Sequence, residues 1–128
     1  MRYLLDSHTL LWFLAGASKL SDKARRIIEH PDHDILTSIA SLWEIGINHS
    51  LGKLNLHRPF AEIIPHHLEI NSIGILGVRV DHVLSVTNLP FHHRDPFDRI
   101  LVAQALVEEI PVVSCDDALD LYGVERIW

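Results

Sequence analysis

Short apolar segments alternate with helical segments along the chain, and this alternation limits the possible folds more than any other feature of the sequence. The apolar segments are short enough for strands, and several end at a polar residue or just before a helix signal. The predicted strands are residues 3–5, 35–37, 73–76, 111–114 and 124–127. Strands that alternate with helices typically form a parallel sheet with helices on both faces. The sequence therefore predicts an α/β fold with a central parallel sheet.

Capping residues mark several of the predicted helices. Ser21 and Ser38 are suited to begin helices, and Gly16 and Gly52 are suited to follow their ends. The predicted helices are residues 9–15, 21–30, 39–51, 60–71, 81–89, 96–109 and 118–122. No internal repeat, linker or low-complexity tract interrupts this pattern. We therefore expect residues 1–128 to form a single domain.

The charge of the chain does not favour a nucleic-acid partner at first sight. There are 17 acidic residues against 11 Lys and Arg, which gives a formal net charge of −6, whereas phosphate backbones attract basic surfaces. Without the four candidate carboxylates described below, the formal charge rises from −6 to −2. A nucleic-acid partner is therefore compatible with the composition if those acids bind cations.

Cysteine and hydropathy patterns indicate a cellular compartment. The chain has one cysteine, Cys115, so no internal disulfide can form, which is typical of a reducing environment. No apolar run approaches the roughly 18 residues of a membrane helix. The ten histidines show no zinc-site spacing. We expect a cytoplasmic protein without a membrane partner.

Two acids follow predicted strands. Asp6 comes after residues 3–5 and Asp116 after residues 111–114. Ligand sites of open parallel sheets lie beyond the carboxyl ends of the strands. Two carboxylates there need compensation, and a hard cation such as Mg²⁺ or Mn²⁺ supplies it. The alternative is that each acid caps the helix that follows it.

Two further acids lie within predicted helices. Glu44 stands among the apolar residues Trp43 and Ile45, although a surface glutamate is the alternative. Asp98 is the third residue of its helix, where Asp95 is suited to be the N-cap. We assign Asp95 to the cap and Asp98 to the chemistry, with a shared role as the alternative.

Four segments resemble PIN-domain proteins in content and order, in particular the VapC-like toxins of bacterial and archaeal toxin–antitoxin systems. The most specific segment begins Arg94-Asp95-Pro96-Phe97-Asp98-Arg99. The segments are residues 4–12, 41–45, 94–105 and 112–116, and the resemblance spans residue 3 to about residue 127.

This resemblance implies a fold, a metal and partners. The implied fold is a three-layer α/β/α sandwich, and the implied cofactor is Mg²⁺ or Mn²⁺. The matching metal ligands and catalytic residues are Asp6, Glu44, Asp98 and Asp116. Ser114 stands where many relatives have Thr, and its hydroxyl can bond a carboxylate or a water. Relatives usually cleave RNA, and those paired with an antitoxin commonly form homodimers.

The expected activity is that of a metal-dependent endoribonuclease. Cation-activated water held by the four carboxylates would hydrolyse RNA phosphodiester bonds, with one or two cations. Arg94 and Arg99 are candidates to hold phosphate, although Arg99 has an acid on its own helix as an alternative partner. The aromatic residues Trp12, Trp43 and Phe97 are expected in the core, with a dimer or antitoxin surface as the alternative for Trp12.

Other classes of protein fit the sequence less well. A small-phosphoester phosphatase with an aspartate nucleophile would need a second acid two residues after Asp6, where His8 stands. A non-catalytic Mg²⁺-binding regulatory module of the receiver type would need a lysine after a late strand, and the last lysine is Lys53. No glycine-rich dinucleotide-binding motif follows Leu5. Hydrolysis of RNA, rather than of small phosphoesters only, separates the nuclease from the first two classes.

Overall fold

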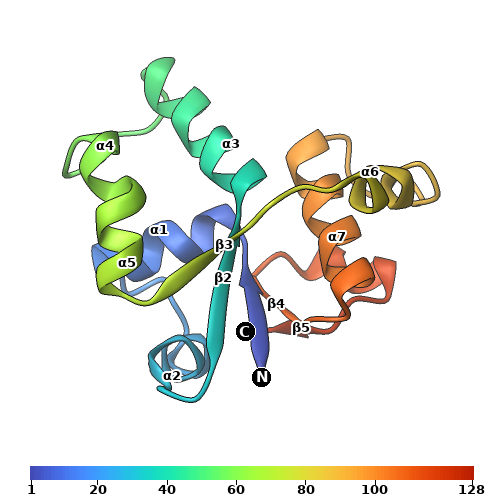
Figure 1. Ribbon diagram of the computed structural model, residues 1–128, viewed down its shortest axis with the longest axis horizontal. Coiled ribbons are helices and arrows are strands. Elements are labelled where there is room, and N and C mark those ends of the chain that lie inside the picture. Colours follow the sequence, from blue (N-terminus) through green and yellow to red (C-terminus); the bar gives the residue numbers. More distant parts are fainter.

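The computed structural model describes all residues, Met1–Trp128, and confirms the predicted α/β class. A single sheet contains five parallel strands in the order β3-β2-β1-β4-β5 (Figure 1). The strands are β1 (Arg2–Leu5), β2 (Asp34–Ser38), β3 (Ile73–Leu76), β4 (Val112–Val113) and β5 (Arg126–Ile127). Because β1 pairs with β2 on one side and with β4 on the other, the strand order changes direction between β1 and β4. Parallel sheets bind ligands at such a point, beyond the carboxyl ends of the strands.

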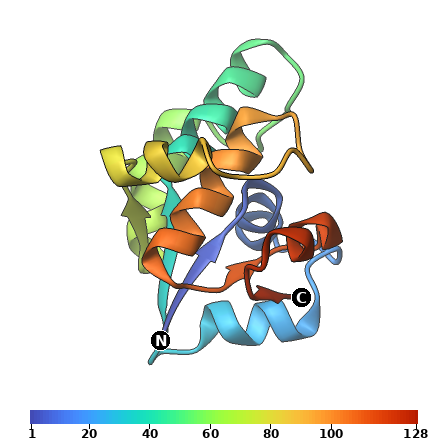
Figure 2. The same cartoon turned by 90° about the vertical axis from the view of Figure 1, so that its right-hand side faces the viewer.

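Helices cover both faces of the sheet, as Figures 1 and 2 show. One face packs against α1 (Ser7–Ala15), α2 (Asp22–Glu29), α3 (Ile39–Ser50) and α5 (Leu68–Ile70). The other face packs against α7 (Pro96–Glu108) and the 3₁₀ turn η2 (Asp117–Tyr122), with α6 (Val80–Val86) at its margin. This is the expected three-layer α/β/α sandwich.

The central strand β1 divides its side chains between the two layers. Leu5 belongs to the hydrophobic cluster under α1, and Leu4 to the cluster under α7. Both are completely buried, because successive side chains of a strand point to opposite faces. Truncation of either leucine to alanine typically costs about 2–5 kcal/mol in the free energy of unfolding.

Most of the predicted helix ends are confirmed. Ser21 and Ser38 accept capping hydrogen bonds of 3.1 Å from the backbone N–H groups of Ala24 and Ala40. Gly16 follows α1 in the left-handed conformation, at φ 63°. That conformation carries a steric cost for residues with a β-carbon, which explains the glycine.

The helix predicted for residues 60–71 is not continuous. The segment contains a short α4 (Phe60–Glu62), the stretch η1 (Ile63–His67), which is kinked at Ile64, and α5 (Leu68–Ile70). Ile64 is extended, at φ −121° and ψ 118°. Pro65 explains this break, because proline disfavours the helical conformation of the preceding residue and lacks the N–H that a helix needs. Three other predicted elements are shorter than expected: the helix over 81–89 is Val80–Val86, the strand over 111–114 is Val112–Val113, and the strand over 124–127 is Arg126–Ile127.

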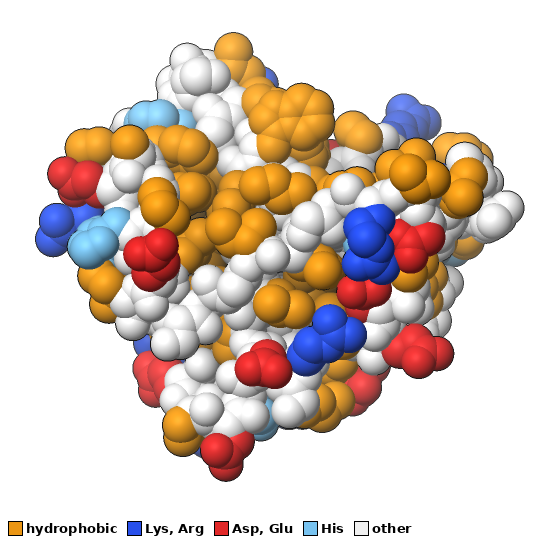
Figure 3. All heavy atoms as spheres, in the orientation of Figure 1, with side chains coloured by type: hydrophobic (Ala, Val, Ile, Leu, Met, Phe, Trp, Pro, Cys, Tyr) orange, Lys and Arg blue, Asp and Glu red, His pale blue; other side chains and the backbone are white.

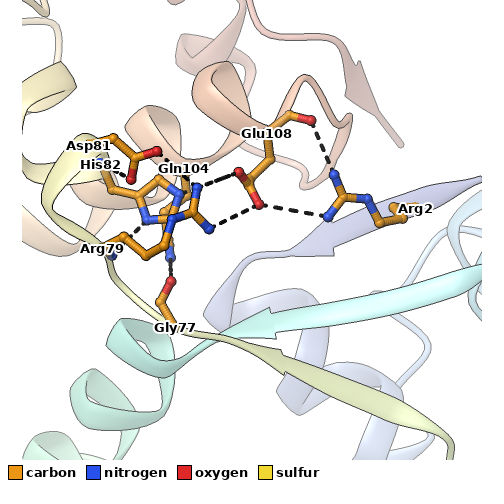
Figure 4. A network of polar contacts seen from close by, with 7 residues as sticks. All are labelled: Arg2, Gly77, Arg79, Asp81, His82, Gln104 and Glu108. Atoms are coloured by element: carbon orange, nitrogen blue, oxygen red, sulfur yellow. Dashed lines mark hydrogen bonds and ion pairs between the residues drawn. The ribbon is translucent and has the colours of Figure 1, made fainter.

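A network of hydrogen bonds and ion pairs connects the start of α6 to the end of α7 (Figure 4). The Arg79 guanidinium donates hydrogen bonds of 2.9 Å to both Asp81 and Glu108. Arg2, at the start of β1, lies 3.7 Å from the Glu108 carboxylate. The pKa values of the Asp81 and Glu108 carboxyls are lowered, chiefly by the hydrogen bond from Arg79. The network lies at the amino end of β1, away from the carboxyl edge of the sheet.

None of the helices combines the length and the apolar character needed to cross a membrane.

Candidate active site

Asp6 and Ser114 directly follow two neighbouring strands and lie side by side. Leu5 of β1 pairs with Val113 of β4, so the next residue on each strand reaches the carboxyl edge at the same level. The Ser114 hydroxyl donates a hydrogen bond to one oxygen of Asp6, and the Thr9 N–H donates a 2.8 Å hydrogen bond to the other. Asp6 thus caps α1, which confirms the capping alternative, and it also lies at the strand change, where its role as a metal ligand stays a prediction.

Asp116 follows β4 and has partners on both carboxylate oxygens. One oxygen accepts a 3.1 Å hydrogen bond from the Ala118 N–H and thereby caps η2. The other lies 2.8 Å from Nε2 of His93. The Asp116 N–H donates to the Ser114 hydroxyl at 3.0 Å, which links this carboxylate segment to Asp6. Sequence reasoning missed His93, because its partner Asp116 is 23 residues away along the chain.

Glu44 is half-buried rather than a surface residue. The Ser7 hydroxyl of α1 donates a 2.6 Å hydrogen bond to Oε1 of Glu44 on α3. Ser7 is a second residue that sequence reasoning missed. Its position directly after Asp6 was the available signal, because the first turn of a helix after a strand lies at the same sheet edge.

Asp98 differs from the other three carboxylates because it makes no hydrogen bond and no ion pair. Its side chain is half-buried near the start of α7. Burial, followed by the charge of Asp95, raises the pKa of Asp98 to about 6. Glu44 and Asp116 raise it further, and His93 opposes them. The charges of Glu44 and Asp116 thus act on Asp98, although they contribute less than burial and the charge of Asp95.

Asp95 occupies the N-cap of α7, as expected. Its carboxylate accepts a 2.8 Å hydrogen bond from the Phe97 N–H. The side chain is exposed, yet its charge acts on Asp98. The cap and the electrostatic influence on the site are therefore both present.

The expectation for Arg99 is wrong in both of its forms. Arg99 is buried and donates to three backbone carbonyls, those of Pro90 at 2.8 Å, Val86 at 3.2 Å and Leu89 at 3.3 Å. The guanidinium of Arg99 thus holds the segment that follows α6. It forms no ion pair with an acid of its own helix and is not free to bind phosphate. Arg94 is exposed and makes no hydrogen bond or ion pair, so it keeps free donors beside the start of α7.

Trp43 is exposed rather than buried, with 66% of its surface accessible, so its predicted place in the core is wrong. Its ring meets the half-buried Phe97 edge-on, with centroids 5.3 Å apart. Both line an apolar groove of about 790 Å³ between α3, α6 and α7, which Arg94 also lines. Figure 3 shows hydrophobic side chains gathered over α3 on this face. Phe97 of α7 contacts the Trp43 ring without covering it, and this follows from the tertiary arrangement.

The donor chemistry of the site fits a hard divalent cation. No three His, Cys, Asp or Glu side chains converge closely enough in this arrangement to surround one ion. The four acids nevertheless offer only carboxylate oxygens, the ligands that Mg²⁺ and Mn²⁺ prefer. Asp98 has no polar partner, and its pKa is raised first by burial and then by neighbouring acids, whose negative charge a cation would offset. The side chains would have to rotate to bring these oxygens around one ion.

Comparisons with known proteins identify the family of the chain. The sequence matches the family model described as PIN domain over residues 3–125. It is 36% identical over 66 residues to Ribonuclease VapC16 of Mycobacterium tuberculosis, a match that covers 52% of this chain and only 45% of that protein.

Solved structures share the fold at low sequence identity. The VapBC2 structure from Rickettsia felis, bound to a DNA fragment from their promoter, has a chain with a TM-score of 0.74 and 13% identity, covering 99% of this chain and 98% of that one. A toxin–antitoxin complex from Klebsiella pneumoniae has a chain with a TM-score of 0.56 and 14% identity, covering 88% of this chain and 84% of that one. The family model spans nearly the whole sequence, and the chain belongs to the PIN-domain family.

Proposed function

We propose that this PIN-domain chain is an endoribonuclease that depends on Mg²⁺ or Mn²⁺ and acts as the toxin of a toxin–antitoxin pair. The observation that carries the proposal is the position of Asp6 and Asp116 at the strand change, with Asp98 nearby and Glu44 joined to the same edge through Ser7. The similarity to a protein named as a ribonuclease supports the reaction class. A cytoplasmic location is consistent with the single cysteine, Cys115.

Asp6, Glu44, Asp98 and Asp116 would hold the cation. When bound, the cation supplies a Lewis acid that activates the attacking water and offsets charge on the phosphate. The serine hydroxyls hold two carboxylates in place: Ser7 holds Glu44 and Ser114 holds Asp6.

Asp98 and Arg94 have proposed roles toward the substrate. Asp98 makes no hydrogen bond within the protein, so it is the carboxylate whose oxygens are free to accept the proton of the attacking water. Arg94 has free guanidinium donors beside the site, so it is suited to bind a phosphate of the RNA backbone. Arg99 takes no part, because its donors are bound to carbonyls.

Two apolar grooves are available for protein partners, which we propose to be a second copy of the chain and a cognate antitoxin. The groove that Trp43 lines has nine hydrophobic residues among twelve. A smaller groove of about 280 Å³ lies along α1, where Trp12, Leu54 and Ile63 line it. Exposed apolar patches of this kind are typical of protein interfaces. The similar structures are VapBC and toxin–antitoxin assemblies, which supports an antitoxin as the partner.

The test of the activity is cleavage of total bacterial RNA and tRNA by the purified protein, with Mg²⁺, Mn²⁺ or EDTA. We expect discrete products that require the metal and that disappear with Asp98→Asn. Equal products from the wild type and the variant would contradict this site. Hydrolysis of small phosphoesters without RNA cleavage would favour the phosphatase class, and metal binding without any hydrolysis would favour a regulatory module.

A further inference from the structure

We propose that His93 is a positioning residue for Asp116 and that Tyr122 in turn fixes His93. The proposal rests on the proposed metal site, since it concerns the orientation of one of its carboxylates. The three side chains come from separate parts of the chain: His93 from the segment between α6 and α7, Asp116 from the end of β4, and Tyr122 from η2.

Both ring nitrogens of His93 have partners. Nε2 lies 2.8 Å from Oδ2 of Asp116, and Nδ1 lies 2.9 Å from the Tyr122 hydroxyl. The His93 and Tyr122 rings are also stacked, with centroids 5.4 Å apart and an interplanar angle of 23°. The His93 side chain is only 12% exposed, whereas that of Asp116 is 40% exposed. A well-buried ring thus holds a carboxylate that faces solvent.

Hydrogen-bond chemistry gives this contact a direction. An ionised carboxylate only accepts hydrogen bonds, so Nε2 of His93 carries the proton that it donates to Asp116. In the neutral ring Nδ1 is then an acceptor, and the Tyr122 hydroxyl donates to it. The tyrosine therefore selects the tautomer, and the tautomer orients the carboxylate.

The contact extends to the other strand end. Asp116 donates its N–H to Ser114, and Ser114 donates its hydroxyl to Asp6. His93 thereby stabilises a hydrogen-bonded chain that includes two of the proposed metal ligands. Partners of this kind typically change metal affinity or activity about 10–100-fold when they are removed, although they touch no metal.

A structural role alone would not require this chemistry. A residue that only anchored the segment before α7 would need bulk, and not two directed hydrogen bonds. His93 instead directs one nitrogen at a site carboxylate and the other at a hydroxyl. The hydrogen bond to Asp116 is therefore the feature to test.

The test measures Mn²⁺ affinity from the electron paramagnetic resonance signal of free Mn²⁺, which does not depend on cleavage. The variants are His93→Ala, His93→Gln, His93→Asn and Tyr122→Phe, with the exposed His66→Ala as the control. We expect His93→Ala to weaken Mn²⁺ binding about tenfold or more.

The Gln amide nitrogen reaches the position of Nε2, so His93→Gln should restore much of the affinity, whereas the shorter His93→Asn should not. Tyr122→Phe should cause a smaller loss, and His66→Ala none.

The outcomes separate this proposal from the proposed function. If the wild type does not bind Mn²⁺, the metal site is wrong and the role of His93 falls with it. If the wild type binds and His93→Ala binds equally well, only the role of His93 is wrong. If His93→Ala does not fold, the Gln and Asn variants decide: equal loss in both would overturn a role through the Nε2 hydrogen bond.

Discussion

The Ser7 hydroxyl donates a 2.6 Å hydrogen bond to Glu44 and so connects the first turn of α1 to the middle of α3. Ser7 directly follows Asp6, which caps α1. One candidate metal ligand, Asp6, is therefore directly followed in the chain by Ser7, the residue that holds a second candidate ligand, Glu44. Glu44 has the longest side chain of the four acids and has the most rotational freedom to lose.

Replacement of Ser7 by alanine should slow RNA cleavage about tenfold, because Glu44 loses the partner that orients it. The melting temperature should change little, since both side chains are only partly buried. Ser50→Ala is the matched control, because the Ser50 hydroxyl bonds only to the Ile47 carbonyl of its own helix. A Ser7→Ala variant with the wild-type rate would show that Glu44 needs no such partner.

Replacement of Asp98 by asparagine should stabilise the metal-free protein at neutral pH. The pKa of Asp98 in the folded state, about 6, is above the ordinary value, so ionisation at higher pH disfavours the fold. The loss of folding free energy caused by ionised Asp98 is absent below pH 4, grows between pH 4 and pH 6, and stays constant above pH 6. Because Asp98 is only half-buried, we expect a gain of about 1 kcal/mol at pH 7.

Urea unfolding in EDTA from pH 4 to pH 8 measures this effect, with the exposed Asp32→Asn as the control. The stability advantage of Asp98→Asn should appear as the pH rises through this range. An advantage that is independent of pH, or a loss of stability at pH 7, would show that the Asp98 carboxylate is a structural group.

Replacement of Arg99 by lysine should destabilise the fold by about 2 kcal/mol, because an ammonium group cannot span three carbonyls in the way a guanidinium does. Arg99→Met should cost more. Chemical unfolding measures both, and Arg94→Lys, on an exposed residue without partners, should differ from the wild type by less than about 0.5 kcal/mol. Equal effects at Arg94 and Arg99 would contradict the structural role of Arg99.

The network around Arg79 should stabilise the protein at neutral pH and not in acid. The pKa values of Asp81 and Glu108 are lowered in the folded state, so their contribution is present above their ordinary pKa values and is lost as the pH falls through the lowered ones. Arg79→Met should therefore lower the melting temperature at pH 7, with a difference that shrinks toward pH 3. Arg26→Met, at an exposed residue without an ion pair, is the control. A difference that stays constant with pH would exclude an ionic origin.

Local signals in the sequence predicted much of the fold. Ser21, Ser38 and Asp95 mark helix starts through side-chain oxygens that act within three residues, and such caps do not depend on the rest of the molecule. The parallel sheet follows from the order of the elements. The placement of Asp6 and Asp116 at one edge follows from the same rule about strand ends, and their chemical roles stay predictions.

The remaining features depend on contacts that the sequence does not display. His93 meets Asp116 across 23 residues, and its role could not be read from spacing. Trp43 is large and apolar, as core residues usually are, yet most of its side chain stays exposed to solvent. The acids near Arg99 in the sequence predict an ion pair for its guanidinium, but the guanidinium donates to backbone carbonyls instead. In each case the tertiary arrangement outweighs the local pattern.

The most direct test of the account is the shift in melting temperature caused by Mg²⁺ or Mn²⁺, because it needs no knowledge of the RNA target. A ligand that binds only the folded state stabilises it by about 2.7 kcal/mol at one hundred times its dissociation constant. The wild type should melt at a higher temperature with the metal, and the exposed-residue control Glu29→Gln should show the same shift. The shift should be largely lost in each of the variants Asp6→Asn, Glu44→Gln, Asp98→Asn and Asp116→Asn. An equal shift in the wild type and in all four variants would contradict a metal site formed by these carboxylates.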